Sequence, residues 1–191
     1  GSEMCIRDRA ASACWTGEKS EVTILYTNDV HTYIDKQAPE LTYAAIAALK
    51  QSYQNAGKKV LLVDAGDHVQ GTADGSMDEG ASIIELMNAA GYDVATPGNH
   101  EFDYGYQNLK DLEADADFTI VDANVLYNGQ VAFEDNVVFT APDGTKIGVF
   151  GLDTPETATK AHPAKIQGVT FLAGDKMFDC AQDQVDALEA E

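Results

Sequence analysis

Apolar residues recur along the first half of the chain in short runs, and the spacing within the runs alternates between that of strands and that of helices. β-branched and alternating residues predict a strand over Glu21–Thr27, and a continuous apolar run predicts one buried on both faces over Lys59–Asp64. A shorter strand is expected over Tyr92–Thr96, before Pro97. Apolar positions at helical spacing predict three helices, which are Leu41–Gln54, Ala81–Ala90 and Tyr106–Ala114.

The second half of the chain is richer in extended segments. Phe118–Val125 and Val131–Thr140 are predicted to be extended, and Asp143-Gly144 predicts a hairpin turn into Lys146–Leu152. A polar connection then leads to a helix expected over Asp175–Glu191. Strands alternating with helices, followed by a β-rich stretch, favour an α/β (α+β) fold built as a layered sandwich.

Residues 1–20 show neither the strand nor the helix spacing of apolar residues and are predicted to be a disordered leader or tag. The fold is therefore expected over residues 21–191. Gly1-Ser2 is typical of a cloning remnant. Ala11–Cys14 resembles the small-residue end of a bacterial lipoprotein signal, although the apolar region that should precede it is missing. Two interpretations stay open for Cys14, a chance cysteine or a lipid anchor in a longer precursor.

The charge of the chain narrows the classes of partner. The net charge of −20 leaves no basic stripe for a nucleic-acid polymer and argues against docking on anionic lipid. The only arginines are Arg7 and Arg9, so a phosphate group must be met by metal ions, lysines or backbone N–H groups. The three cysteines lack the C-x-x-C spacing of a zinc knuckle and give no disulfide framework.

Acidic and histidine-bearing stretches follow each of the three predicted strands of the first half, about one strand–helix–strand unit apart. They are Asn28–His31, Gly66–His68 and Gly98–Asp103. Ligands bind beyond the carboxyl ends of the strands in an open α/β sheet, so the three loops are expected to meet at one edge. Oxygen and imidazole are ligands of divalent metals. The pattern therefore predicts most of a two-metal phosphoesterase site.

Four of these residues are candidate metal ligands. The two-residue step from Asp29 to His31 can place both side chains on one ion, and the amide oxygen of Asn99 is an acceptable ligand. The carboxylate of Asp67, between glycines, has two oxygens and can bridge two ions. Taken alone, Asp29-x-His31 and the stretch around Asp67 are more typical of a turn or a cap, whereas Asn99–Asp103 is the most specific of the three.

Two further residues are candidates for catalysis. His100 could face the substrate, with Asp103 fixing its orientation and raising its pKa, so that the imidazolium stabilises charge or donates a proton. His68 is expected to point away from the metals.

Four segments carry a resemblance to a known family. They are ILYTNDVH (24–31), VDAGDHVQGT (63–72), MNAAGYDVATPGNHEFDYG (87–105) and FGLDTPETATKAHP (150–163). Together they resemble the metallophosphoesterase (calcineurin-like) superfamily, and within it the bacterial 5'-nucleotidase/UDP-sugar hydrolase family. The resemblance implies an αββα sandwich, an extracytoplasmic location, and hydrolysis of a nucleotide or nucleotide sugar by metal-activated water.

The resemblance also implies the role of each residue. Asp29 and His31 would hold one divalent ion, Asp67 would bridge two, and Asn99 would hold the second, with manganese, zinc, iron, cobalt or magnesium as candidates. His100 and Asp103 would form the catalytic dyad.

The chain departs from the family at its C-terminal end. The family has two further histidine stretches and a C-terminal nucleoside-binding domain, all expected beyond Glu191, and His162 is a poor substitute. Residues 21–191 are therefore predicted to be an N-terminal fragment, nearly inactive alone. Three alternatives stay open, which are a 2',3'-cyclic-nucleotide phosphodiesterase/3'-nucleotidase, a thiosulfate-ester hydrolase, and a non-catalytic metal-binding or strand-exchanged module. Asp103 favours the 5'-nucleotidase branch over the first of these.

Overall fold

A parallel four-stranded sheet organises the first half of the protein. The computed structural model describes residues 21–34, 42–141 and 143–190, so the predicted leader and Cys14 lie outside the described residues. The strands run in the order β1-β2-β3-β4 and every pairing is parallel. They are β1 (Val22–Thr27), β2 (Lys59–Asp64), β3 (Val94–Ala95) and β4 (Thr119–Ile120).

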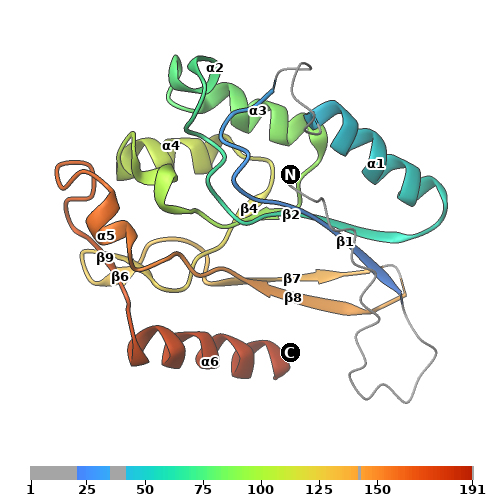
Figure 1. The fold of residues 1–191 in the computed structure, drawn as a ribbon. Helices are drawn as coiled ribbons and strands as arrows, with labels where there is room; N and C mark the ends of the chain where they lie inside the picture. The colour runs from blue at the N-terminus through green and yellow to red at the C-terminus, as the bar shows by residue number, and fades with distance from the viewer. Residues whose placement is uncertain (1–20, 35–41, 142, 191) are drawn as a thin grey trace.

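Helices cover one face of this sheet, as Figure 1 shows. They are α1 (Tyr43–Asn55), α2 (Ala73–Ser76), α3 (Ala81–Ala90) and α4 (Tyr106–Asp115). Their apolar positions pack with the sheet into one core, in which Leu62 and Met87 are fully buried. The Thr42 hydroxyl accepts a hydrogen bond from Ala45 N and so begins α1, whereas Gly91 ends α3 at a φ of 76°.

Antiparallel strands and a last helix form the other layers. β7 (Asn136–Thr140) pairs with β8 (Lys146–Phe150) below the parallel sheet, and α6 (Asp175–Glu189) lies below that hairpin (Figure 1). A separate three-stranded sheet has the order β6-β5-β9. Its strands are β5 (Val125–Tyr127), β6 (Gln130–Val131) and β9 (Val169–Phe171). The succession of helices, sheet, hairpin and helix confirms the predicted layered α/β sandwich.

The structure departs from the predicted elements where polar residues are buried. The run predicted over Phe118–Val125 is divided, because Asp122 and Asn124 form a buried turn between β4 and β5. The predicted polar connection contains a short helix, α5 (Thr157–Lys160). The predicted hairpin at Asp143-Gly144 is confirmed by the pairing of β7 with β8. Within the described ranges, none of the helices has the length and apolar character that crossing a membrane requires.

Candidate metal centre

The three predicted stretches lie together at the carboxyl edge of the parallel sheet. Asp29 and His31 follow β1, Asp67 follows β2, and Asn99 and His100 open η1 (Asn99–Phe102), a 3-10 turn that follows β3. The β1 and β2 loops are joined through their backbones, since Asp29 N donates to Gly66 O at 3.0 Å and His31 N to Asp67 O at 2.9 Å. The parallel register of β1 and β2 therefore continues into the site.

The backbone at three of these residues adopts the left-handed conformation. Asp29, His31 and Asp67 have φ angles of 53°, 47° and 59°. Non-glycine residues seldom occupy this region, and such residues gather at functional sites where the surrounding structure holds them. Here the hydrogen bonds between the two loops supply that restraint.

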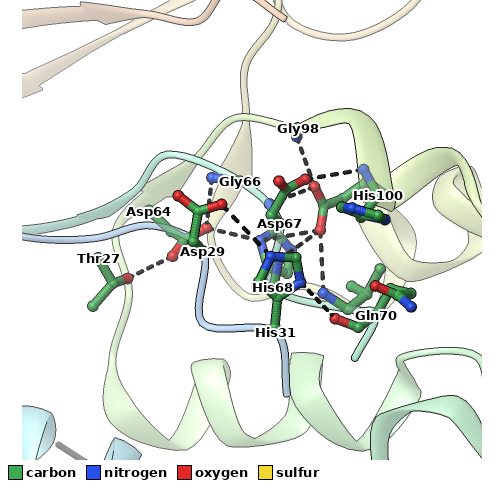
Figure 2. A network of polar contacts seen from close by, with 12 residues as sticks. Thr27, Asp29, His31, Asp64, Gly66, Asp67, His68, Gln70, Gly98 and His100 are labelled. Atoms are coloured by element: carbon green, nitrogen blue, oxygen red, sulfur yellow. Dashed lines mark hydrogen bonds and ion pairs between the residues drawn. The ribbon is translucent and has the colours of Figure 1, made fainter. Parts of the chain in front are cut away.

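Three side chains converge at the centre of the site, as Figure 2 shows. A ligand atom from each of His31, Asp67 and His100 lies within 4.8 Å of the other two. The two imidazole rings approach edge to face with their centroids 5.1 Å apart, and Asp67 Oδ1 accepts a hydrogen bond from His100 N at 2.9 Å. Residues from three separate loops thus surround one point.

Two predicted ligands lie at the margin of this group. Asp29 is exposed, and its Oδ1 is 3.6 Å from His31 Nε2. Asn99 follows Gly98, which lies so close to Asp67 that a Cβ on the glycine would meet Asp67 Oδ1 at 2.5 Å. The backbone therefore carries Asn99 to the same edge, and its role as a ligand, like that of Asp29, stays a prediction.

His100 and Asp103 form the predicted pair. His100 Nδ1 and Asp103 Oδ2 are 2.7 Å apart, which leaves Nε2 as the free nitrogen of the ring. Burial opposes protonation of His100, but the hydrogen bond and charge of Asp103 outweigh it and raise its pKa above the ordinary value. The ring is oriented and inclined to carry a proton. It is also close enough to Asp67 to be a metal ligand, a role that the sequence did not suggest.

A fully buried carboxylate holds the loops in place. Glu101 accepts hydrogen bonds from Gly98 N and Asp67 N through Oε2, at 2.6 and 2.7 Å. Through Oε1 it accepts from His68 N and Val69 N, at 2.8 and 3.1 Å. Burial would raise the pKa of Glu101, but the charge of His68 and these N–H groups bring it below the ordinary value. The sequence analysis did not single out Glu101. The one sequence feature that could have indicated it is an acidic residue close to a glycine turn.

His68 belongs to this buried support. As predicted, it is absent from the group formed by His31, Asp67 and His100. Its Nδ1 lies 2.8 Å from Asp64 Oδ1 and 3.6 Å from Glu101 Oε1. Burial opposes its charge, yet the charges of Glu101 and Asp64 raise the pKa of His68 to about 9. His162 is exposed elsewhere, on the connection before β9.

The central group fits a divalent ion. Burial raises the pKa of Asp67 above its ordinary value, so its carboxylate sits where a cation would stabilise its charged form. Two imidazoles and a carboxylate are a donor set for zinc, manganese, iron or cobalt. The arrangement can therefore gather metal ions at the edge of the sheet and present His100 beside them.

Comparison with known proteins agrees with this geometry. The profile of the family described as calcineurin-like phosphoesterase matches residues 22–181. The 5'-nucleotidase of Bos taurus is 31% identical over an alignment of 187 positions, which covers 88% of this chain and 32% of the bovine protein. The chain thus spans about a third of the length of that curated relative.

Solved structures give the same result. The 5'-nucleotidase precursor from Thermus thermophilus superposes with a TM-score of 0.74 at 30% identity, covering 87% of this chain and 34% of that one. The calcineurin-like phosphoesterase YfkN from Bacillus subtilis has a TM-score of 0.72, also at 30% identity, with 87% of this chain and 57% of that chain covered. The fold is shared with both.

Proposed function

The chain belongs to the calcineurin-like phosphoesterase family, and we propose that it is the N-terminal part of a metal-dependent nucleotide phosphohydrolase of the 5'-nucleotidase/UDP-sugar hydrolase type. The observation that carries the proposal is the convergence of His31, Asp67 and His100 from three loops. The substrate class rests on the relatives named as 5'-nucleotidases. An extracytoplasmic location, as suggested by the sequence before Cys14, is part of the same proposal.

Each residue has a proposed task. Asp29 and His31 would hold one divalent ion, Asn99 would hold a second, and the Asp67 carboxylate would contribute to both. When bound, such ions neutralise phosphate charge and activate a water for in-line attack. The absence of arginine beyond Arg9 makes this neutralisation necessary, because the chain is strongly acidic and repels a phosphate ester.

In this proposal the imidazole ring of His100 acts directly on the substrate. Its Nδ1 is engaged by Asp103 at 2.7 Å, so Nε2 is the atom that can donate a hydrogen bond or a proton to the phosphate or the leaving oxygen. The raised pKa of His100 favours the protonated form of the ring. Asp103 orients the ring and stabilises its charge.

We propose further that residues 21–191 bind metal but turn over slowly alone. Within the described residues, the second ion would have only Asp67 and Asn99 as protein ligands, and two ligands rarely hold a divalent ion tightly. The family's two further histidine stretches and its nucleoside-binding domain would supply the remainder in a longer protein.

The test separates metal binding from turnover. Titration calorimetry with Mn²⁺ is expected to show binding that Asp67→Ala abolishes, and phosphate release from AMP is expected to stay near background. The matched control is Asp117→Asn, a change at an exposed carboxylate, which should bind Mn²⁺ like the wild type. Absence of binding even at millimolar Mn²⁺ would contradict the metal centre. Robust turnover lost in Asp67→Ala would contradict only the inactivity of the fragment.

The substrate is tested on a longer version that includes the missing stretches. Faster hydrolysis of AMP than of 2',3'-cyclic AMP is expected. The reverse preference would favour the cyclic-phosphodiesterase alternative.

A further inference from the structure

Two aspartates outside the metal centre are buried together behind the same edge of the sheet. Asp122 follows β4 and Asp153 follows β8, and their exposed fractions are 0% and 2%. Neither has a task in the proposed hydrolysis. Carboxylates are seldom fully buried unless they are paired, so two together need a physical explanation.

Asn124 joins the two aspartates. Its backbone N donates to Asp122 Oδ1 at 2.9 Å, and its side-chain Oδ1 accepts from Asp153 N at 2.8 Å. Its Nδ2 also donates to Asp153 O at 2.9 Å. The adjoining backbones meet as well, since Ala123 N donates to Gly151 O at 3.0 Å. Asn124 therefore ties the Asp122 carboxyl group to the backbone of Asp153 within the buried interior, and the charge of Asp122 acts on the Asp153 carboxyl group.

Only one oxygen of each carboxyl group is satisfied. Asp122 Oδ1 also accepts from Val125 N at 2.8 Å, and Asp153 Oδ1 accepts from Thr157 Oγ1 at 3.1 Å. The Oδ2 atoms of both aspartates are buried and have no hydrogen-bond partner among the described residues. A buried oxygen that accepts nothing costs stability, and the cost is larger when the oxygen carries charge.

In the part of the chain that the structure describes, the neighbouring elements bring no cation to the pair. From η1, Glu101 acts on Asp153 with a second negative charge. From α6, the thiol of Cys180 faces Asp122 and donates to Ala123 O at 3.0 Å. The hydroxyls of Thr96, directly after β3, and of Thr157, in α5, are neutral. A proton is the one positive charge that needs no additional space in such a site.

We propose that Asp122 and Asp153 share a single proton between their otherwise unpaired oxygens, forming a buried acid pair that ties the end of β4 to the segment after β8. One carboxyl group donates its O–H and the other accepts it, so the pair carries one negative charge instead of two. The proposal is independent of the hydrolytic function, because neither aspartate lies among the proposed metal ligands.

The expected pH dependence follows from the burial of both groups. Burial raises the pKa of Asp122 to about 7, and burial together with the charge of Asp122 raises the pKa of Asp153 to about 8. The unfolded chain titrates near the ordinary value of about 4. Stability from the pair is therefore complete below about pH 4 and is lost as the pH rises through the folded-state values. A pKa that is one pH unit higher in the folded chain than in the unfolded chain corresponds to about a tenfold change in the folding equilibrium constant.

The single variants Asp122→Asn and Asp153→Asn test this directly in the 191-residue chain. Each keeps the Oδ1 acceptor and places an NH₂ donor where the shared proton would be, so each mimics the protonated pair. Urea unfolding is followed between about pH 5 and pH 9 in EDTA, which removes metal effects. We expect both variants to match the wild type near pH 5 and to unfold at higher urea than the wild type near pH 9. The control Asp117→Asn should follow the wild-type curve.

A direct readout keeps the proposal falsifiable if a variant folds poorly. In wild-type protein with ¹³C-labelled aspartate, the carboxyl resonances of the pair should titrate well above the ordinary pKa of aspartate, and each single variant should remove this titration at high pH. Two carboxyl resonances that both titrate below about pH 5 would overturn the proposal. So would stabilisation of the wild type, but not of the variants, by Na⁺ or Ca²⁺, since the pair would then bind a metal cation.

Discussion

Two buried acidic clusters stand behind the same edge of the sheet, and they solve the problem of buried charge differently. In the first, Asp64 and Glu101 flank His68, and backbone N–H groups from the loops after β2 and β3 donate to the Glu101 carboxylate. In the second, Asp122 and Asp153 have acceptors left over and acidic neighbours. The first cluster can stay ionised, whereas the second is stabilised by holding a proton.

The difference assigns different tasks to the clusters. In the first cluster, Glu101 accepts hydrogen bonds from Asp67 N and Gly98 N, so this carboxylate fixes the positions of the metal-binding loops. The second joins β4 to the segment after β8 and reaches η1 only through the charge of Glu101. We therefore expect changes in the first cluster to affect metal binding and stability together, and changes in the second to affect stability and its pH dependence.

Removing the charge of Glu101 should give the largest effect. In Glu101→Gln the side chain keeps its size, but its NH₂ group faces N–H donors and His68 loses a charged partner. Breaking a buried charged network costs about 3–5 kcal/mol, and we expect that loss in urea unfolding at neutral pH. Mn²⁺ affinity should fall as well, because the loops bearing Asp67 and Asn99 lose their common anchor.

The matched control for that experiment is Glu85→Gln on the exposed side of α3, which should change neither quantity. Unaltered stability and Mn²⁺ affinity in Glu101→Gln would show that the loops do not depend on the buried carboxylate.

Titration of His68 should give the next largest effect. Its pKa is raised from the ordinary value to about 9, so its contribution is complete below about pH 6.5 and is lost as the pH rises through about 9. A rise of this size in the pKa is worth about 3 kcal/mol of stability. Imidazole NMR of the metal-free protein should show His68 still protonated near pH 8, where an ordinary histidine side chain is neutral. A neutral His68 at pH 7 would mean that the first cluster has no cation, and the proposed difference between the two clusters would be wrong.

Much of the fold could be predicted because its signal is local. β2 and α3 occupy the residues that periodicity indicated. A strand buried on both faces and a helix ended by glycine are each determined by residues that are consecutive in the sequence. The division of Phe118–Val125 was not predictable in this way. It depends on Asn124, whose side chain is hydrogen-bonded to the backbone of Asp153, far along the chain.

The candidate site shows the same limit. The spacing of Asp29, Asp67 and Asn99 after strands placed them at one edge, because parallel strands end together. The left-handed backbone at His31 and the four N–H bonds of Glu101 arise only when loops from different strands meet. The sequence alone identifies candidate ligands, but it does not show that Glu101 is the acidic residue that holds their loops in place.

Two threonines offer the smallest and most closely matched comparison. The Thr27 hydroxyl donates to Asp64 Oδ2 in the first cluster, and the Thr157 hydroxyl donates to Asp153 Oδ1 in the second. Replacing either by valine keeps the shape and removes one donor, which costs about 1 kcal/mol for an ordinary hydrogen bond and more when the acceptor is charged. Thr27→Val should therefore cost a similar amount at all pH values between about 5 and 8. Thr157→Val should cost little near pH 5 and more near pH 8, where Asp153 loses its proton and depends more on each donor. Urea unfolding of both variants at the two pH values measures this difference, and equal pH profiles would contradict a protonation state peculiar to the second cluster.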